Sequence, residues 1–195
     1  MKYLFMYYKF IKQFKKFNNL RDTIKTNFAK MKVAVVRIRG TVNVDGRIKT
    51  TLDLLKIKYK NNCNVVELDD TYKGMINKAK DYVTYGPVDK ETFKEMLLKR
   101  GEILQNKTED AKNETIKIND ETIKLLSPNF KSVDEFVDAF FENKAKFGDI
   151  NLKLPFRLTP PTKGFERKGI KIPYTLGGAL GNRETAINGL LKRMI

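Results

Sequence analysis

Few residues in this chain of 195 could carry catalysis. It contains no His, so the commonest general acid or base near neutral pH and the commonest metal ligand are both missing. Asp69 and Asp70 follow an expected strand, where catalytic carboxylates often lie, but stabilisation of a helix N-terminus explains such a pair. Cys63 has no His or second Cys to activate it or share a metal, so we predict a small core residue. The sequence predicts no enzyme, no cofactor, no metal site and no small-molecule substrate.

One glycine-rich string, Gly177-Gly178-Ala179-Leu180-Gly181, loosely matches a phosphate-binding loop. Glycines let backbone N–H groups approach an anion closely. A nucleotide-binding loop also needs a preceding strand and a following Lys-Ser or Lys-Thr pair, and both are missing. A turn and a backbone contact with RNA phosphates remain as alternatives.

Charge is the strongest signal in the composition. Lys and Arg number 39 against 23 Asp and Glu, a net charge of +16 at pH 7, and such an excess concentrates polyanions around a protein. Residues 1–30 carry +7, 31–87 carry +5, 88–150 carry −3 and 151–195 carry +7. We therefore expect nucleic acid at both ends of the chain, and a solvated or protein-contacting module between residues 88 and 150.

The segment from Leu154 to Arg183 combines cations with aromatic rings. Repeated Pro and Gly deny it regular structure, and such a segment usually becomes ordered only on a partner. An extended chain of this composition pairs its cations with phosphates while its rings stack on bases or sugars. We predict RNA contacts from Arg157, Lys163, Phe165, Arg167, Lys168, Lys171, Tyr174 and Arg183.

Residues 1–30 are rich in Lys, Phe and Tyr. They fit an amphipathic helix whose chemistry suits a membrane surface or an RNA groove equally, unless translation begins at Met31. The lipophilic stretch from Tyr3 to Phe10 is broken by Lys9, so it falls short of the roughly 20 apolar residues of a membrane span. One Cys and no cleavable signal favour a cytoplasmic protein with no membrane partner.

The elements that position these residues begin with a β-α-β-α-β unit over residues 31–87. Side chains alternate along a strand, so Arg37 and Arg39 should share one face of the first strand. The first helix should bury Ile48, Leu52, Leu55 and Tyr59. We predict strands over 32–39, 64–68 and 82–86, with helices capped by Asp45 and Thr71 between them. A small sheet with two helices on one face accommodates this order, although periodicity does not determine the strand order.

Residues 88–150 predict a helical extension. A helix from Asp89 ends at Gly101, and the polar stretch 105–119 suggests a loop. Ser132 and Glu135 form an expected capping box for a strongly aromatic helix, which must bury its rings against another part of the protein. Further short helices are predicted over 120–126 and 184–193.

Three strings carry a family resemblance: Val35-Val36-Arg37-Ile38-Arg39-Gly40-Thr41, Thr51-Leu52-Asp53-Leu54-Leu55 and Tyr72-Lys73-Gly74-Met75-Ile76-Asn77-Lys78. With them, residues 31–86 resemble the large-subunit ribosomal protein called thirty in bacteria and archaea and seven in eukaryotes. The strings Val88–Thr92, Phe156–Phe165 and Gly177–Glu184 look like the extension of the archaeal and eukaryotic forms. The resemblance, closest to the archaeal branch, covers nearly all of residues 31–195.

The resemblance implies an α+β fold with a small ferredoxin-like β-α-β-α-β core, a helical insertion and an extended basic C-terminal segment. The implied partners are large-subunit rRNA, near five-S rRNA, and neighbouring ribosomal proteins, in a ribosome-bound cytoplasmic protein without catalysis. The chain departs from the family at Thr159, Thr162 and Thr175, which puts particular RNA contacts there in doubt. The core residues expected to contact RNA are Arg37, Arg39, Arg47, Lys49 and Lys73.

The favoured hypothesis is thus RNA scaffolding by charge compensation, with little readout of bases. The expected units are an N-terminal extension (1–30), an RNA-binding core (31–87), a helical extension (88–150) and a basic tail with a short terminal helix (151–195). A free regulatory RNA- or DNA-binding protein is the alternative, and it would require sequence-selective binding by the isolated chain.

Overall fold

The computed structural model describes residues 31–104, 115–126 and 130–195, so the expectations for residues 1–30 lie outside the described part. Its strands are β1 (Lys32–Arg37), β2 (Asn62–Glu67), β3 (Val83–Pro87), β4 (Glu102–Leu104), β5 (Thr115–Lys117), β6 (Phe156–Arg157) and β7 (Gly181–Asn182). Its helices are α2 (Gly46–Leu54), α3 (Asp70–Lys78), α4 (Lys90–Arg100), α5 (Asp120–Leu126), α6 (Val133–Phe141) and α7 (Ala186–Met194), with 3-10 turns η1 (Phe147–Ile150) and η2 (Tyr174–Leu176).

A five-stranded sheet in the order β6-β2-β1-β3-β7 forms the centre of the molecule. β1 lies between β2 and β3 and is antiparallel to both, so β2 and β3 run parallel to each other. Only the connection through α3 therefore joins parallel strands, whereas the connection through α2 joins antiparallel neighbours. The predicted α+β class with a β-α-β-α-β core is confirmed.

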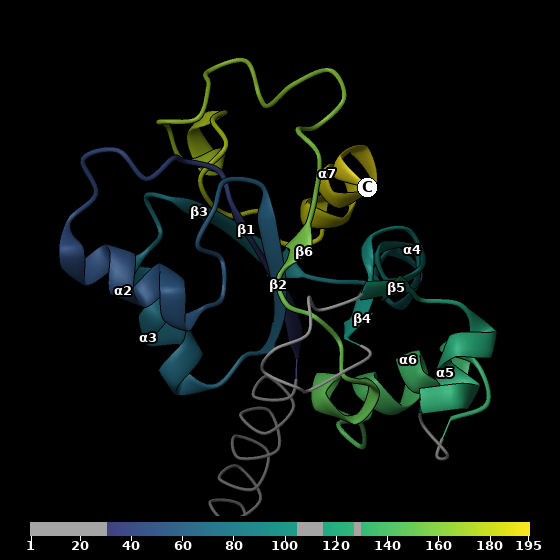
Figure 1. Cartoon of the computed structure of the whole chain (residues 1–195). Coiled ribbons are helices and arrows are strands. Elements are labelled where there is room, and N and C mark those ends of the chain that lie inside the picture. Colours follow the sequence, from purple (N-terminus) through teal and green to yellow (C-terminus); the bar gives the residue numbers. More distant parts are fainter. Residues whose placement is uncertain (1–30, 105–114, 127–129) are drawn as a thin grey trace, which may run out of the picture.

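Helices cover both faces of the sheet, because β1 is apolar on each side. Val33 and Val35 face α2 and α3 in one core cluster, while Ala34 and Val36 belong to a second cluster with α4, α6 and α7. In Figure 1, α2 and α3 lie on one side of the strands and α4 to α6 on the other. The predicted pair of helices on one face of the sheet is therefore confirmed, and α4, α6 and α7 cover the other face.

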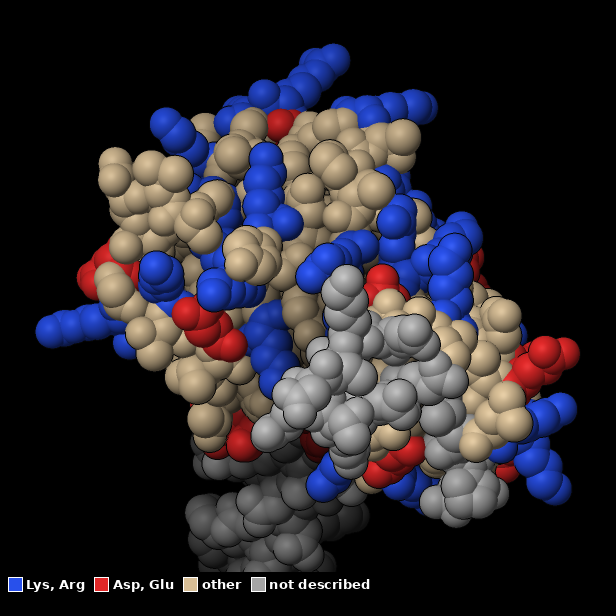
Figure 2. Space-filling model, viewed as in Figure 1, with Lys and Arg blue, Asp and Glu red and all other residues tan. Residues whose placement is uncertain are grey.

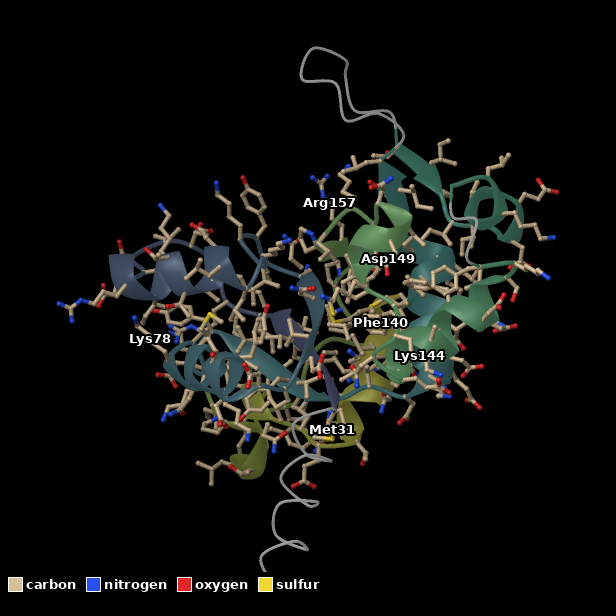
Figure 3. All side chains as sticks on the ribbon, turned by 90° about the horizontal axis from the view of Figure 1, so that it is seen from below. Met31, Lys78, Phe140, Lys144, Asp149 and Arg157 are labelled. Carbon is tan, nitrogen blue, oxygen red and sulfur yellow. The ribbon has the colours of Figure 1, made fainter. Side chains whose placement is uncertain are left out.

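The aromatic helix α6 buries its rings in that second layer. Phe140 stacks on Phe93 of α4 at 4.9 Å between ring centroids and on Phe147 at 4.5 Å. Phe156 of β6 meets Phe93 edge-on at 6.5 Å, which joins the helices to the sheet. Such ring pairs add about 0.5–1.5 kcal/mol each beyond their buried area. Figure 3 shows Phe140 directed into this interior.

Several local predictions need correction. Tyr59 is 59% exposed because α2 ends at Leu54, so it does not extend the buried stripe. Asp69, rather than Thr71, caps α3 and accepts a hydrogen bond from the Asp70 backbone N–H at 2.7 Å. The predicted loop 105–119 contains β5, which pairs with β4 in a small separate sheet.

The C-terminal segment is ordered on the protein's own sheet, contrary to the expectation that it needs a partner. β6 pairs with β2 at one edge, and β7 pairs in parallel with β3 at the other. The helix that follows, α7, buries Ile187, Leu190 and Leu191, as predicted. Among the described residues, none of the helices is long and apolar enough to cross a membrane.

Gly86 provides a sensitive test of the contact between β3 and α7. A Cβ added there would overlap the Glu184 carbonyl oxygen and lie 3.0 Å from Ile187 Cγ2. We expect Gly86→Ala to destabilise the protein by about 1–3 kcal/mol in urea unfolding, because the helix must shift. Gly189→Ala, within α7 where a Cβ meets nothing within 4 Å, should instead stabilise by roughly 0.5–1 kcal/mol. Equal changes in the free energy of unfolding for Gly86→Ala and Gly189→Ala would contradict this packing of α7 on β3.

Candidate nucleic-acid interface

Arg37 lies inside the core rather than on a surface. Its Nε donates to Arg39 O at 2.9 Å, and Nη2 donates to Gly40 O at 2.9 Å. Nη1 donates to the carbonyl of Lys58 and, at 3.4 Å, to that of Ile57. Burial lowers the pKa of this guanidinium, partly offset by the charge of Asp53. Arg37 therefore holds two loops at the end of β1, which differs from the predicted RNA contact.

Arg183 also points inward, where it forms what we call the Arg183 cluster with Glu166, Thr84 and Tyr174. Its Nε donates to Thr84 Oγ1 at 2.8 Å, and Nη2 donates to Ala179 O at 3.1 Å and Glu166 Oε2 at 2.5 Å. Nη1 donates to Glu166 Oε1, and the guanidinium lies 4.7 Å from the Tyr174 ring centroid. Arg183 and Tyr174 thus fasten the C-terminal segment to β3.

Glu166 is the acidic centre of this cluster. Burial opposes ionisation of the carboxyl, but hydrogen bonds from Arg183 and the charges of Arg183 and Arg193 outweigh it, so the pKa lies below its ordinary value. Arg193 of α7 adds an ion pair at 3.7 Å and donates to Gly164 O at 3.1 Å. The carboxylate therefore links the segment to the terminal helix as well as to β3.

Two more residues that were predicted to contact RNA make contacts within the protein instead. Arg39 lies beyond the end of β1, stacks on Tyr82 at 4.8 Å and donates to Asp81 O at 3.1 Å. Phe165 is half-buried and packs against two of the core clusters. Neither side chain is freely presented to a ligand.

The remaining predicted residues are exposed, and they fall into separate groups. α2 carries Arg47 and Lys49, while Lys73 on α3 pairs with Asp70 at 3.4 Å. Arg157 lies on the edge strand β6. The largest group, which we call the basic loop, is Lys163, Arg167, Lys168 and Lys171. Figure 2 shows cationic side chains projecting from the top of the molecule, where the C-terminal segment runs in Figure 1.

The basic loop is held in position by several internal bonds. The hydroxyls of Thr159 and Thr162 donate to the carbonyls of Met194 and Arg193 at 2.7 and 2.9 Å, so these departures from the family pattern fasten the segment to α7. A pre-ordered loop loses less conformational entropy on binding than a free tail. Its cations are therefore presented in a defined arrangement.

The glycine-rich string forms a tight turn. The N–H of Gly177 donates to Tyr174 O at 2.9 Å, that of Gly178 to Pro173 O at 3.0 Å, and that of Leu180 to Ile172 O at 3.1 Å. A Cβ at Gly178 would overlap the Ile172 carbonyl. These N–H groups already have acceptors, so the turn accounts for the glycines without a bound phosphate.

Within the described residues, no group of three or more His, Cys, Asp or Glu side chains is arranged to hold a metal. Cys63 is fully buried in the core, as predicted, and burial raises the pKa of its thiol to about 12. We expect native protein to resist maleimide labelling at pH 8 and to label rapidly in guanidinium, because the thiolate is the reactive form. Rapid labelling of the native chain would contradict this burial.

Sequence reasoning missed cations in the helical extension. Lys99, Arg100 and Lys117 of this extension lie with Lys153 around Arg157 in one pocket, although residues 88–150 are slightly acidic as a whole. The net charge of a segment does not show which side chains the fold brings together. No sequence pattern marked them, because Lys117 lies opposite Glu102 only once β4 and β5 pair.

Comparison with known proteins agrees with the fold. The family model described as ribosomal protein L30p/L7e matches residues 33–83, from β1 to the start of β3. Three curated relatives carry the name large ribosomal subunit protein uL30. That of Methanococcus maripaludis is 40% identical over 85% of this chain and 100% of its own length. That of Methanopyrus kandleri is 43% identical over 81% and 100%, and that of Nanoarchaeum equitans is 40% identical over 83% and 97%.

Proposed function

The chain belongs to the ribosomal protein L30p/L7e family, and we propose from this that it is a structural constituent of the large ribosomal subunit that binds and packs rRNA. The observation that carries the RNA role is the basic loop, whose four cations have no acidic partner among the described residues. Closely packed phosphates need fixed positive charge between them, and such contacts position a protein without reading bases.

The partners are rRNA and other ribosomal proteins. We further infer that the protein lies near five-S rRNA and works bound to ribosomes in the cytoplasm, as the family resemblance implies. The exposed cations of α2, Arg47 and Lys49, provide a second surface for RNA, separate from the basic loop.

We infer that the protein works without catalysis. Asp69 caps α3 and Cys63 is an unreactive core thiol, so both sequence candidates for chemistry have structural roles. The chain contains no His to serve as a general base.

Binding of the purified chain to different nucleic acids tests this proposal. We expect tight binding to deproteinised large-subunit rRNA, weaker binding to small-subunit rRNA and only salt-sensitive, non-selective binding to duplex DNA. Photochemical cross-linking within purified large subunits should recover five-S rRNA or its immediate neighbours. Selective binding to one DNA or messenger RNA sequence, with no preference for large-subunit rRNA, would favour a free regulator instead.

A further inference from the structure

A pocket of about 240 Å³ lies where the helical extension meets the edge of the central sheet. Five cations line it, with one carboxylate, from the end of α4, the β4–β5 hairpin, the chain after η1, and β6. Figure 3 shows Arg157 at this junction between the two parts of the molecule. The residues of this basic pocket are Lys99, Arg100, Gly101, Glu102, Lys117, Lys153, Pro155 and Arg157.

Among the residues that the structure describes, only part of this positive charge is neutralised. Lys153 Nζ pairs with Glu102 Oε2 at 2.8 Å, and Arg100 Nη2 donates to the terminal oxygen of Ile195, the last residue in the sequence, at 2.8 Å. Lys99, Lys117 and Arg157 have no hydrogen-bond or ion-pair partner in the part of the chain that the structure describes. Counting side chains alone, with Glu102 ionised, the five cations and one carboxylate of the described lining carry a net charge of +4.

Strand pairing holds these like charges together. Lys117 lies directly opposite Glu102 across β4 and β5, and the Lys153 backbone N–H donates to Glu102 O at 2.8 Å on the other side. Arg157 is held by the pairing of β6 with Asn62 of β2. Like charges that line one pocket repel each other, and an anion between them would relieve the repulsion. The backbone thus maintains an arrangement that favours an anionic ligand.

The side chains lining the pocket indicate which part of a nucleic acid it would take. None of the described residues that line it is aromatic, so none of them offers a stacking surface for a base. Arg and Lys are residues that bind phosphate oxygens, and Glu102 is the single acidic side chain in the part of the lining that the structure describes. A phosphate backbone fits these groups better than a nucleobase does.

We propose that the basic pocket binds phosphates of the rRNA backbone and thereby anchors the helical extension to RNA. This inference rests on the proposed function and adds a contact in the segment whose overall charge suggested a solvated or protein-contacting module. The C-terminal segment runs from this pocket to the basic loop, so one continuous stretch of chain would carry both RNA contacts.

The salt dependence of rRNA binding tests this contact. We compare the wild-type chain with Lys99→Gln/Lys117→Gln and with the control Lys124→Gln/Lys131→Gln, which removes two exposed cations of the same extension outside the pocket. The slope of log K against log salt, measured with deproteinised large-subunit rRNA, should become shallower by about 2 for the pocket variant. The control should keep the wild-type slope, and thermal unfolding should show that both variants fold.

A tethered cleavage reagent locates the contact independently. Because Cys63 is buried, an iron chelate can be attached at one site only, either to Thr115→Cys, two residues before Lys117 on β5, or to Glu91→Cys, in the first turn of α4. In reconstituted large subunits, we expect strong rRNA cleavage from position 115 and weaker cleavage from position 91.

The outcomes separate the two proposals. If the wild-type chain neither binds large-subunit rRNA nor enters the subunit, the proposed function fails. The pocket inference alone is overturned if the wild type binds and both double variants keep its salt slope. It is also overturned if the salt slope becomes shallower by the same amount in both double variants. An unchanged slope together with poor subunit incorporation of the pocket variant would show that a protein neighbour occupies the pocket, which also overturns it.

Discussion

Arg183→Met should destabilise the protein by about 3 kcal/mol or more, because it leaves a partly buried carboxylate without its main partner. The Arg183 side chain is 2% exposed, and its guanidinium connects Thr84, Ala179 and Glu166. Arg193, at 3.7 Å, cannot replace these bonds. Urea unfolding measures the change, and limited proteolysis should show earlier cleavage within residues 160–180.

Two controls make this prediction specific. Arg167→Met removes an exposed cation from the same segment and should change stability by less than about 0.5 kcal/mol. Arg183→Lys should rescue little, because an ammonium cannot pair with both carboxylate oxygens and also reach Thr84. If Arg183→Met were as stable as Arg167→Met, the Arg183 cluster would not hold the segment in place.

The same cluster sets a pH dependence. The pKa of Glu166 is lowered in the folded protein, so its ion pairs stabilise the fold above the ordinary Glu pKa and this stabilisation is lost as pH falls through the folded pKa. The stability difference between wild type and Glu166→Gln should therefore shrink as pH is lowered from 7 towards 3. A stability difference that stays constant between pH 7 and pH 3 would contradict the lowered pKa of Glu166 in the folded protein.

Arg167→Gln/Lys171→Gln should weaken binding to large-subunit rRNA on the order of 50-fold at 0.1 M salt and make the log–log salt slope shallower by about 2, as expected for two lost phosphate contacts. Both side chains are exposed and neither has an acidic partner in the described structure, so the fold should be unaffected. Titrations at several salt concentrations measure both quantities.

The matched control for this prediction is again Lys124→Gln/Lys131→Gln, with the same change in net charge. It should bind nearly as tightly as the wild type, with an unchanged slope. Equal weakening in the two double variants would mean that rRNA responds only to total charge, and the basic loop would then have no special role.

Much of the fold followed from local sequence patterns. The bounds of α5 match the prediction, with an acidic first residue and Pro128 two residues beyond its last. The apolar runs predicted the three core strands to within two residues of their bounds. Long-range pairing was not predictable: β6 and β7 each contain two residues, too few to show a period, and their partners lie far away in the sequence.

The candidate site was predicted less completely, for a related reason. The alternation of side chains along a strand predicted that Arg37 lies on one face of β1. It did not show that the carbonyls of Lys58 and Gly40 would accept hydrogen bonds from that side chain. Composition grouped Arg183 with the exposed cations of its segment, although Glu166 and Thr84 bury it. Whether an arginine is free or internally bonded depends on acceptors that only the folded chain brings near.

Fractionation of native-host lysate on a sucrose gradient, with the chain detected by mass spectrometry, tests the ribosomal role most directly. We predict that the protein sediments with the large subunit at low magnesium and remains bound through a moderate salt wash, with an intact mass that also shows whether translation begins at Met1 or Met31. Recovery of the whole pool in the soluble top fractions would contradict the assignment of this chain to the large ribosomal subunit.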